Sequence, residues 1–450
     1  MKKIVVFITL ILALIMCMAS CDLLKSLDPQ PEHTHEFGEW STTENATCTK
    51  EGVKVRYCTC GEKQSEIVPK SSHNVVIDEA LNPSCTTTGL TEGKHCSVCN
   101  EVLVAQTVID ELVHNYSNGA CTRCGATLYV RCDEDGTLNE NGDYILFGEY
   151  PQTKVTDTTL SEALSAMASS YGWISYEYYI SGSNTTDFMW YQDVTYGTER
   201  YRGVYFTSYR PYHTDSSGSN TYQDNNGYTL NTAATAYWFK WEPLMWTILT
   251  ESNGEALLLC NSIIDSMEYY NNSTSNRTEN GETVYPNNYA ESNIRAWLNS
   301  TFYETAFNEL QQAIILQTEV DNSAKSTNPY GDETYWNSGV NDYACENTYD
   351  KIFLLSEEEV TNPNYGFSSS YSESDEARRK QTSDYAQCQG VSTISNSGSK
   401  YYGNGGWWLR SPHCDDRAIA RAIIDFGNAN SYYGVRGTSF GVVPALRIRL

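Results

Sequence analysis

Apolar residues from residue 143 onwards form short runs that are separated by polar clusters rich in turn-forming residues. Runs of β-branched, leucine and aromatic residues predict strands that begin at Tyr144 and continue at 238–250, 256–260, 350–356, 407–412, 418–426 and 441–449. Apolar positions at helical spacing predict helices over 160–169, 292–299 and 308–316. Polar stretches at 213–232 and 269–288 predict long surface loops. This mixture predicts an α+β domain over 143–450.

The helix predicted over 292–299 shows the pattern most clearly. Ser292 is suited to the N-cap, where its hydroxyl accepts a hydrogen bond from the first turn. Ile294, Trp297 and Leu298 recur three and four positions apart, so they share one face. We expect that face to be buried.

The N-terminus carries a pattern typical of export. Lys2 and Lys3 precede an uncharged, mainly apolar run at 4–18, which is shorter than the ~20 residues that a spanning helix needs. The segment Met18-Ala19-Ser20-Cys21 resembles the lipobox of bacterial lipoproteins. That resemblance implies removal of a signal peptide at 1–20, lipidation of Cys21, and a location on the extracellular face of the cell membrane. An ordinary cleaved signal and an uncleaved anchor remain open, and residues 21–34 are predicted to be a tether.

Histidine and cysteine recur at regular spacing after the tether. The spacing defines one repeat at 35–72, a second at 73–113 and a truncated third at 114–132. In each copy, a pair of cysteines precedes Gly or Asn, which predicts a tight knuckle turn at 58–61, 96–100 and 121–125. Runs at 66–68 and 102–104 predict strands. A copy of this length cannot bury a sufficient core, so we expect cross-links.

Zinc is the cross-link that the composition favours, because three thiolates and one imidazole form a structural tetrahedral site. Three cysteines in each full copy also leave one thiol over if only disulfides form. Disulfides, which persist outside the cell, and free thiols remain open. The predicted sets are Cys48, Cys58 and Cys60 with His73 or His35, then Cys85, Cys96 and Cys99 with His114 or His73, and Cys121 with Cys124 in the third copy.

Overall charge excludes one class of partner. The chain has 30 Lys and Arg against 56 Asp and Glu, a formal net charge of −26. A nucleic-acid binder needs a basic face to neutralise phosphates, so nucleic acid is not an expected partner. Attraction to anionic lipid through surface charge is equally disfavoured.

Two parts of the sequence resemble known groups of proteins. The repeats at 32–126 resemble cysteine-rich modules with an ATCT…C..CG…GH pattern in surface proteins of Gram-positive anaerobes, which implies a spacer or interaction module. The C-terminal part resembles an exported domain of unknown function from Gram-positive gut bacteria. A more distant similarity to C-type-lectin-like and sulfatase-activating-enzyme-like folds implies a lectin-like α+β architecture. The blocks that carry the second resemblance are FGEYPQ (147–152), SNIRAWLN (292–299), DKIFLLS (350–356), WWLRSP (407–412) and GVVPAL (441–446).

Candidate catalytic groups are weak, so we expect a non-catalytic protein. The adjacent glutamates at 357–359 cannot face one another across a substrate, and 413–416 is a polar segment that follows a proline. Trp407, Trp408 and Arg410 are candidate ligand-binding residues, because Trp and Arg favour binding hot spots, although a core role suits them equally. We predict a lipid-anchored extracellular binding or adhesion protein for a glycan or another protein. An extracellular enzyme on a lectin-like scaffold and a structural envelope protein are the alternatives.

Overall fold

The computed structural model divides into two compact units, Met1–Val113 and His114–Leu450. The division coincides with the predicted start of the third repeat, which belongs to the second unit. The predicted signal peptide, Cys21 and the predicted loop at 213–232 lie outside the described residues. The structure describes residues 34–117, 119–168, 172–180, 185–205, 236–270, 275–279, 281–331, 338–429, 431–437 and 439–450.

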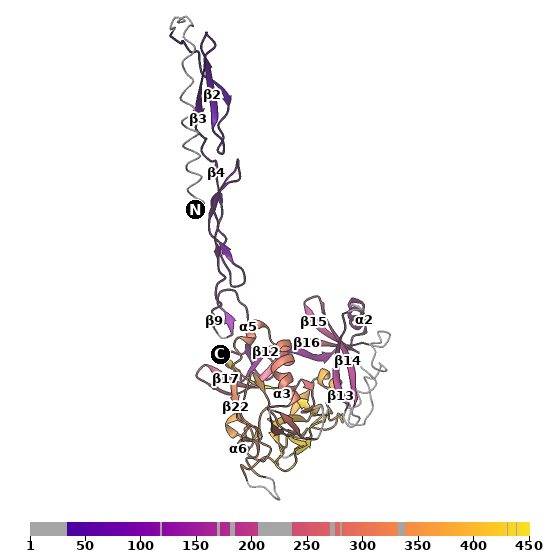
Figure 1. Ribbon diagram of the computed structural model, residues 1–450. Helices are drawn as coiled ribbons and strands as arrows, with labels where there is room; N and C mark the ends of the chain where they lie inside the picture. The colour runs from indigo at the N-terminus through magenta and orange to yellow at the C-terminus, as the bar shows by residue number, and fades with distance from the viewer. Residues whose placement is uncertain are drawn as a thin grey trace, which may run out of the picture. The chain divides into compact units, whose positions relative to one another are not determined.

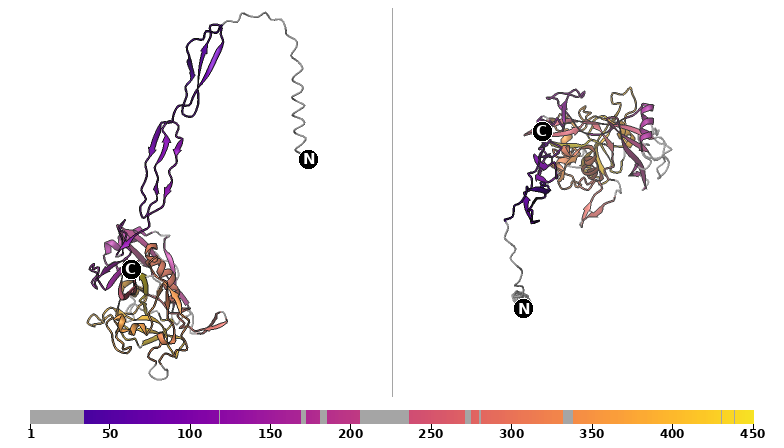
Figure 2. Two further views of the ribbon diagram at one scale, coloured as in Figure 1. Left: turned by 90° about the vertical axis from the view of Figure 1, so that its left-hand side faces the viewer. Right: turned by 90° about the horizontal axis from the view of Figure 1, so that it is seen from above.

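The first unit contains two three-stranded antiparallel sheets, one in each repeat, and one two-stranded sheet (Figure 1). The first repeat forms a sheet of β1 (Ser41–Glu44), β2 (Gly52–Tyr57) and β3 (Lys63–Val68). The second repeat forms a sheet of β4 (Val75–Asp78), β6 (Gly93–Cys96) and β7 (Val102–Val104), and β5 (Gly89–Leu90) pairs with β8 (Val108–Ile109). The strands predicted at 66–68 and 102–104 are confirmed. Each repeat is a narrow ribbon without a second layer (Figure 2).

The described residues of the first unit form almost no hydrophobic core. Among its described apolar residues, the buried ones are Cys48, Val55, Cys58, Cys85 and Cys96. Valines elsewhere in the unit face solvent, as the 70% exposure of Val98 illustrates. Four of the five buried side chains are cysteines, so contacts among sulfur atoms take the place that a core normally has.

The second unit is built around one large sheet with the strand order β13-β14-β15-β16-β17-β31-β24. Strand β12 also pairs with β16, and β11 with β12. Irregular register within the β12–β16 and β16–β17 pairs lets these strands bend over the core. The bounds are β11 (Val130–Cys132), β12 (Tyr144–Lys154), β13 (Ile174–Ile180), β14 (Thr185–Tyr196), β15 (Glu199–Tyr205), β16 (Tyr237–Ser252), β17 (Glu255–Cys260), β24 (Ile352–Phe353) and β31 (Ala445–Arg449).

Smaller sheets complete the second unit. A five-stranded sheet contains β19 (Asp265–Ser266), β30 (Gly441–Val442), β27 (Trp407–Pro412), β28 (Ile419–Ile423) and β29 (Ser431–Gly434). A three-stranded sheet joins β18 (Ser262–Ile263), β25 (Lys380–Thr382) and β26 (Asn404–Gly405). The two-stranded pairs are β9 (Tyr116–Ser117) with β10 (Ala120–Cys121), β20 (Arg277–Glu279) with β21 (Glu282–Val284), and β22 (Thr318–Val320) with β23 (Thr348–Asp350). The β20–β21 hairpin occupies part of the stretch at 269–288 that was predicted to be a loop.

Helical segments are mostly short. Ser292 caps α3 as predicted, with its Oγ accepting from the N–H of Arg295, and Ile294, Trp297 and Leu298 are buried. The segments are α2 (Thr158–Met167), α3 (Asn293–Trp297), the π-helical η2 (Leu298–Phe302), α4 (Tyr303–Ala306), α5 (Glu309–Gln312), α6 (Ala324–Thr327), the 3₁₀ turns η3 (Glu359–Thr361) and η4 (Pro363–Tyr365), and α7 (Asp384–Gln389).

The predicted α+β, C-type-lectin-like fold is wrong. The described residues are mainly β, and they form many small sheets around one large one. The helix predicted at 308–316 is only the single turn α5, and the 16-residue β16 exceeds the strand predicted within it. The apolar residues at helical spacing therefore form short helical turns that pack against the β-sheets. They do not form a separate layer of helices.

A single large cluster of buried side chains forms the main core of the second unit. It includes Trp246 of β16, Leu258 of β17 and Trp407 of β27, each with 0% exposure. A second, smaller cluster packs Leu164 of α2 against Trp238 of β16. Within the described residues, no helix combines the length and apolarity that crossing a membrane requires.

Candidate metal centres

The predicted knuckle turns are present in all three repeats and share one backbone pattern. In each, the residue after the second cysteine has a positive φ: 93° at Gly61, 59° at Asn100 and 74° at Gly125. The N–H of that residue donates to the carbonyl of the first cysteine at 2.8 Å in every copy. Gly and Asn tolerate this left-handed conformation best, which explains why the sequence has these residue types there.

Strand register brings a histidine to each knuckle. The residue two positions after His35, His73 and His114 pairs with the first cysteine of the knuckle in its own copy. The pairs are Phe37 with Cys58, Val75 with Cys96, and Tyr116 with Cys121. Residues two apart in a strand lie on the same face, so each histidine ring lies beside the sulfurs of its knuckle.

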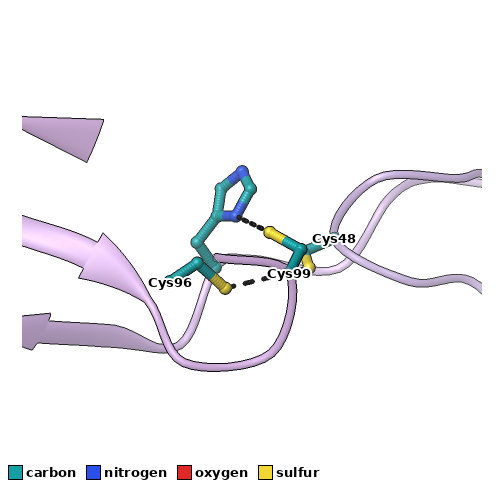
Figure 3. Close-up of side chains that lie close together, drawn as sticks. Cys48, Cys96 and Cys99 are labelled. Atoms are coloured by element: carbon teal, nitrogen blue, oxygen red, sulfur yellow. Dashed lines mark hydrogen bonds between the residues drawn. The ribbon is translucent and has the colours of Figure 1, made fainter. Parts of the chain in front are cut away.

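One cluster has four ligand atoms. The Sγ atoms of Cys48, Cys96 and Cys99 and a ring nitrogen of His73 all lie within 4.8 Å of one another. Cys96 and Cys99 lie on the knuckle of the second repeat, whereas Cys48 comes from the loop between β1 and β2 of the first repeat (Figure 3). The cluster therefore draws its ligands from two consecutive repeats.

The distances within this cluster match a tetrahedral zinc site. With Zn–S of ~2.3 Å and Zn–N of ~2.0–2.1 Å, two sulfur ligands lie ~3.8 Å apart, and a sulfur and a nitrogen ~3.6 Å apart. The Sγ atoms of Cys48 and Cys96 are 3.9 Å apart, and Cys99 Sγ is 3.5 Å from His73 Nδ1. A disulfide would need an S–S distance of ~2.05 Å. The arrangement thus fits a shared metal ion better than a covalent bridge.

A carboxylate lies behind the histidine. His73 presents Nδ1 to Cys99, while its Nε2 lies 3.5 Å from a carboxylate oxygen of Glu101. A carboxylate in this position fixes the tautomer and strengthens the imidazole as a ligand, as in many zinc sites. His95, the residue directly before the knuckle, instead contacts Asp78 through Nδ1 at 2.7 Å and is not part of the cluster.

The knuckle favours the thiolate form of its first cysteine. Burial by itself raises the pKa of Cys96, but hydrogen bonds from the backbone N–H groups of Cys99 and Val98 and from His73 lower it to about 5. The corresponding Cys121 of the third repeat has its pKa lowered to about 5 by the same kinds of hydrogen bond, against the effect of burial. A thiolate is the form that binds a metal, so these turns are electrostatically prepared for a cation.

The observed ligand set corrects the predicted one. Cys85 was grouped with Cys96 and Cys99, but Cys48 takes that place, and Cys85 is buried elsewhere in the first unit. Of the two histidines predicted as alternatives for this set, His73 is the one that lies with Cys96 and Cys99. The physical reason is that the loop carrying Cys48 turns away from its own knuckle and reaches the next one.

Two further groups have three ligand residues within one unit. His35, Cys58 and Cys60 have ligand atoms within 4.8 Å of one another, with His35 Nδ1 at 3.1 Å from Cys60 Sγ. His114, Cys121 and Cys124 are grouped in the second unit, with Cys124 Sγ at 3.4 Å from His114 Nδ1. Each group contains a knuckle and the histidine of its own copy.

The candidate ligand-binding residues of β27 lie in the core. Trp407 and Trp408 have 0% exposure, and Arg410 has 1%. The Arg410 guanidinium donates to the main-chain carbonyls of Asp321 and Leu354 and pairs with Glu359. These contacts tie strands and turns together from inside, and leave no surface for an external ligand.

A cavity of about 770 Å³ in the second unit is a feature that the sequence did not indicate. Asp193 lies in its wall, and the carboxylate accepts two hydrogen bonds from the Arg202 guanidinium, at 2.8 and 3.0 Å. The same carboxylate accepts a third hydrogen bond, from Arg200, at 2.9 Å. Arg200 also lies 3.4 Å from Glu149 and stacks on Trp241, with its guanidinium carbon 3.6 Å from the ring centre. The two arginines and two carboxylates balance, so these four groups add no net charge to the site. Tyr191 contributes an aromatic side chain to the cavity wall.

Comparison with known families covers the C-terminal part of the chain. Residues 253–450 match a family described as a domain of unknown function (DUF6273). This agrees with the resemblance to an exported domain of unknown function. No curated protein and no solved structure is found to match the chain.

Proposed function

We propose that the N-terminal repeats bind structural zinc and act as a metal-linked spacer for the C-terminal domain. The observation that carries this proposal is the cluster of Cys48, His73, Cys96 and Cys99, whose 3.9 Å and 3.5 Å separations match the edges of a zinc tetrahedron. The near absence of a core over residues 34–113 supports it, because a zinc site supplies folding free energy that the packing of such a module does not.

In this proposal the zinc ion of the four-ligand cluster links the first repeat to the second. Cys48 lies between β1 and β2, and the other three ligands lie around the sheet of β4, β6 and β7. Removing the metal would therefore release one repeat from its neighbour as well as loosen the knuckle. A spacer made in this way is stiffened at the junction of the first and second repeats by metal coordination.

Metal content of the full chain tests the zinc proposal. His73→Ala should lose about one zinc ion per chain, because four ligands are needed for a closed structural site. His95→Ala is the matched control: it removes an imidazole from the same sheet, but one that contacts Asp78 and not the sulfurs. Equal zinc content in the two variants, or no zinc in the wild-type chain purified without chelators, would contradict the proposal.

We further propose that the protein is anchored at the extracellular face of the cell membrane by lipid on Cys21. The lipobox-like segment 18–21 supports this. Mass spectrometry of the mature N-terminus should find a diacylated cysteine at residue 21, and Cys21→Ala should leave the precursor unprocessed. An unmodified N-terminus downstream of Cys21 would refute the anchor without bearing on the zinc sites.

For the second unit we propose non-catalytic binding of an uncharged, hydroxyl-rich ligand such as a cell-surface glycan. The balanced charges around Asp193 and the aromatic side chain of Tyr191 in the wall of the 770 Å³ cavity support it, since sugars bind through hydrogen bonds and stacking. A glycan and cell-wall-fragment screen of the whole chain should find ligands whose binding is lost in Arg200→Ala. Lys325→Met, an exposed cation outside the cavity, is the control. Turnover of a bound glycan would favour the enzyme alternative, and no binding at all the structural one.

A further inference from the structure

A second cavity in the C-terminal unit contains a buried lysine without a counter-charge. The cavity has a volume of about 520 Å³, within the range of small-molecule sites. Lys380, the first residue of β25, lines it and is only 4% exposed. No carboxylate of the described residues lies within ion-pair distance of this lysine, and its ammonium donates no hydrogen bond to any of them.

Such a lysine is costly in a purely structural role. A buried ammonium is normally paired, because removing it from water without a partner is strongly unfavourable. Burial lowers the pKa of Lys380 to about 8, and the thiol of Cys260 is the one nearby group that acts against this. The domain therefore keeps a destabilising cation at the wall of an open cavity, which is the pattern expected of a ligand site.

Other charged groups of the cavity do not replace the missing partner. Arg379 is occupied by the main-chain carbonyl of Phe426, the hydroxyl of Ser374 and the carboxylate of Glu376. The carboxylates that line the cavity all belong to exposed residues, and its two tyrosines are half-buried. These groups are Glu134, Asp143 and Glu376, with Tyr144 and Tyr365.

Part of the remaining wall is apolar, and Thr247, Asn261 and Asn364 contribute polar side chains. Leu249 of β16, Leu259 of β17 and Phe367 are buried and line the same space. The cavity thus combines one buried, unpaired cation, an apolar wall and exposed carboxylates. A ligand that satisfies all three carries a carboxylate, an apolar group and an amine.

We propose that this cavity binds a free amino acid with an apolar side chain, whose carboxylate pairs with Lys380. The ligand's ammonium group faces the exposed carboxylates, and its side chain packs on Leu259 and Phe367. The site is separate from the 770 Å³ cavity, since the two share no lining residue. The proposal is therefore independent of the glycan-binding proposal above.

Thermal unfolding of the full chain with L-leucine, leucinamide and acetate tests this. L-Leucine should raise the Tm of the C-terminal unit in a saturable way, by roughly 2–4 °C. Leucinamide lacks the carboxylate, and acetate lacks the amine and the apolar side chain. At the same concentration, each should therefore raise the Tm less than L-leucine does. A shift with leucinamide or acetate equal to that with L-leucine overturns the proposal, as does no shift with L-leucine or L-phenylalanine.

Substitution of the lysine gives the second arm. Lys380→Met keeps the length and apolar stem but removes the charge, and it should abolish the L-leucine shift. Lys380→Gln is a second variant that keeps a polar end group, and it should give the same loss. Lys325→Met, at an exposed site outside the cavity, should respond as the wild type does. An undiminished L-leucine shift in both Lys380 variants overturns the proposal.

Discussion

Replacing Lys380 by methionine should make the C-terminal unit more stable, which is unusual for a substitution of a buried residue. Burial lowers the pKa of this lysine from its ordinary value of 10.5 to about 8. At ~1.4 kcal/mol per pKa unit, this corresponds to a penalty of about 3 kcal/mol when the lysine is charged. Methionine fills the same space without the charge, so Lys380→Met should raise the free energy of unfolding at pH 7 by up to about 3 kcal/mol.

The pH dependence of this gain follows from the direction of the shift. A lysine whose pKa is lowered by folding binds fewer protons in the folded than in the unfolded state between pH 8 and 10.5. The stability of the wild type therefore rises with pH through that window, and the penalty is fully present below pH 8. Lys380→Met lacks this rise, so the difference between variant and wild type should shrink above pH 8.

Chemical denaturation at several pH values measures this difference. Comparing the two proteins at each pH matters, because burial raises the pKa of tyrosines such as Tyr150 and Tyr289, which lowers the stability of both proteins at high pH. Cys260 titrates in the same region, with a pKa raised by burial to about 11. A variant that is less stable than the wild type at pH 7, or a difference that does not change between pH 7 and pH 9.5, would refute the reasoning.

Two substitutions elsewhere in the second unit test its packing. Trp297→Ala should lower the free energy of unfolding by about 3–5 kcal/mol, since the indole is 8% exposed and stacks on Phe302 with 5.3 Å between ring centres. An unchanged denaturation midpoint would mean that this face does not hold the helix to the core. Asp193→Ala should lower the free energy of unfolding by about 3–5 kcal/mol, because it leaves the buried guanidinium of Arg202 without its bidentate partner. If urea unfolding shows a decrease below about 1 kcal/mol, the ion pair is not needed for stability.

Local chemistry of the knuckles could be predicted from the sequence, but the ligand that crosses between repeats could not. Cysteine spacing and the following Gly or Asn sufficed for the turns at 58–61, 96–100 and 121–125, because the backbone conformation there depends on adjacent residues only. Which sulfur completes the set with Cys96 and Cys99 depends on where the loop around Cys48 lies in space. Sequence proximity favoured Cys85, and that choice was wrong. Glu101 behind His73 was missed for the same reason.

The fold of the second unit shows the same limit. The cap and buried face of the helix at 292–299 were predicted from side-chain spacing, since a helix contains its own hydrogen bonds. The β assignment of 238–250 was right. Its place inside the large sheet, however, depends on pairing with β12 and β15, which are distant in sequence. The unpaired Lys380 gave no signal at all, because only burial makes a lysine exceptional.

The most direct test of the central claim is to compare a metal chelator with a reductant on the full chain, using limited proteolysis of residues 34–113 as the readout. A strong zinc chelator should make this region rapidly cleavable and leave the C-terminal unit resistant, because the four-ligand cluster holds the repeats together. A reductant alone should change nothing, since the sulfurs of Cys48 and Cys96 are 3.9 Å apart and not bonded. If the reductant opens the repeats and the chelator does not, disulfides hold this region and the zinc account is wrong.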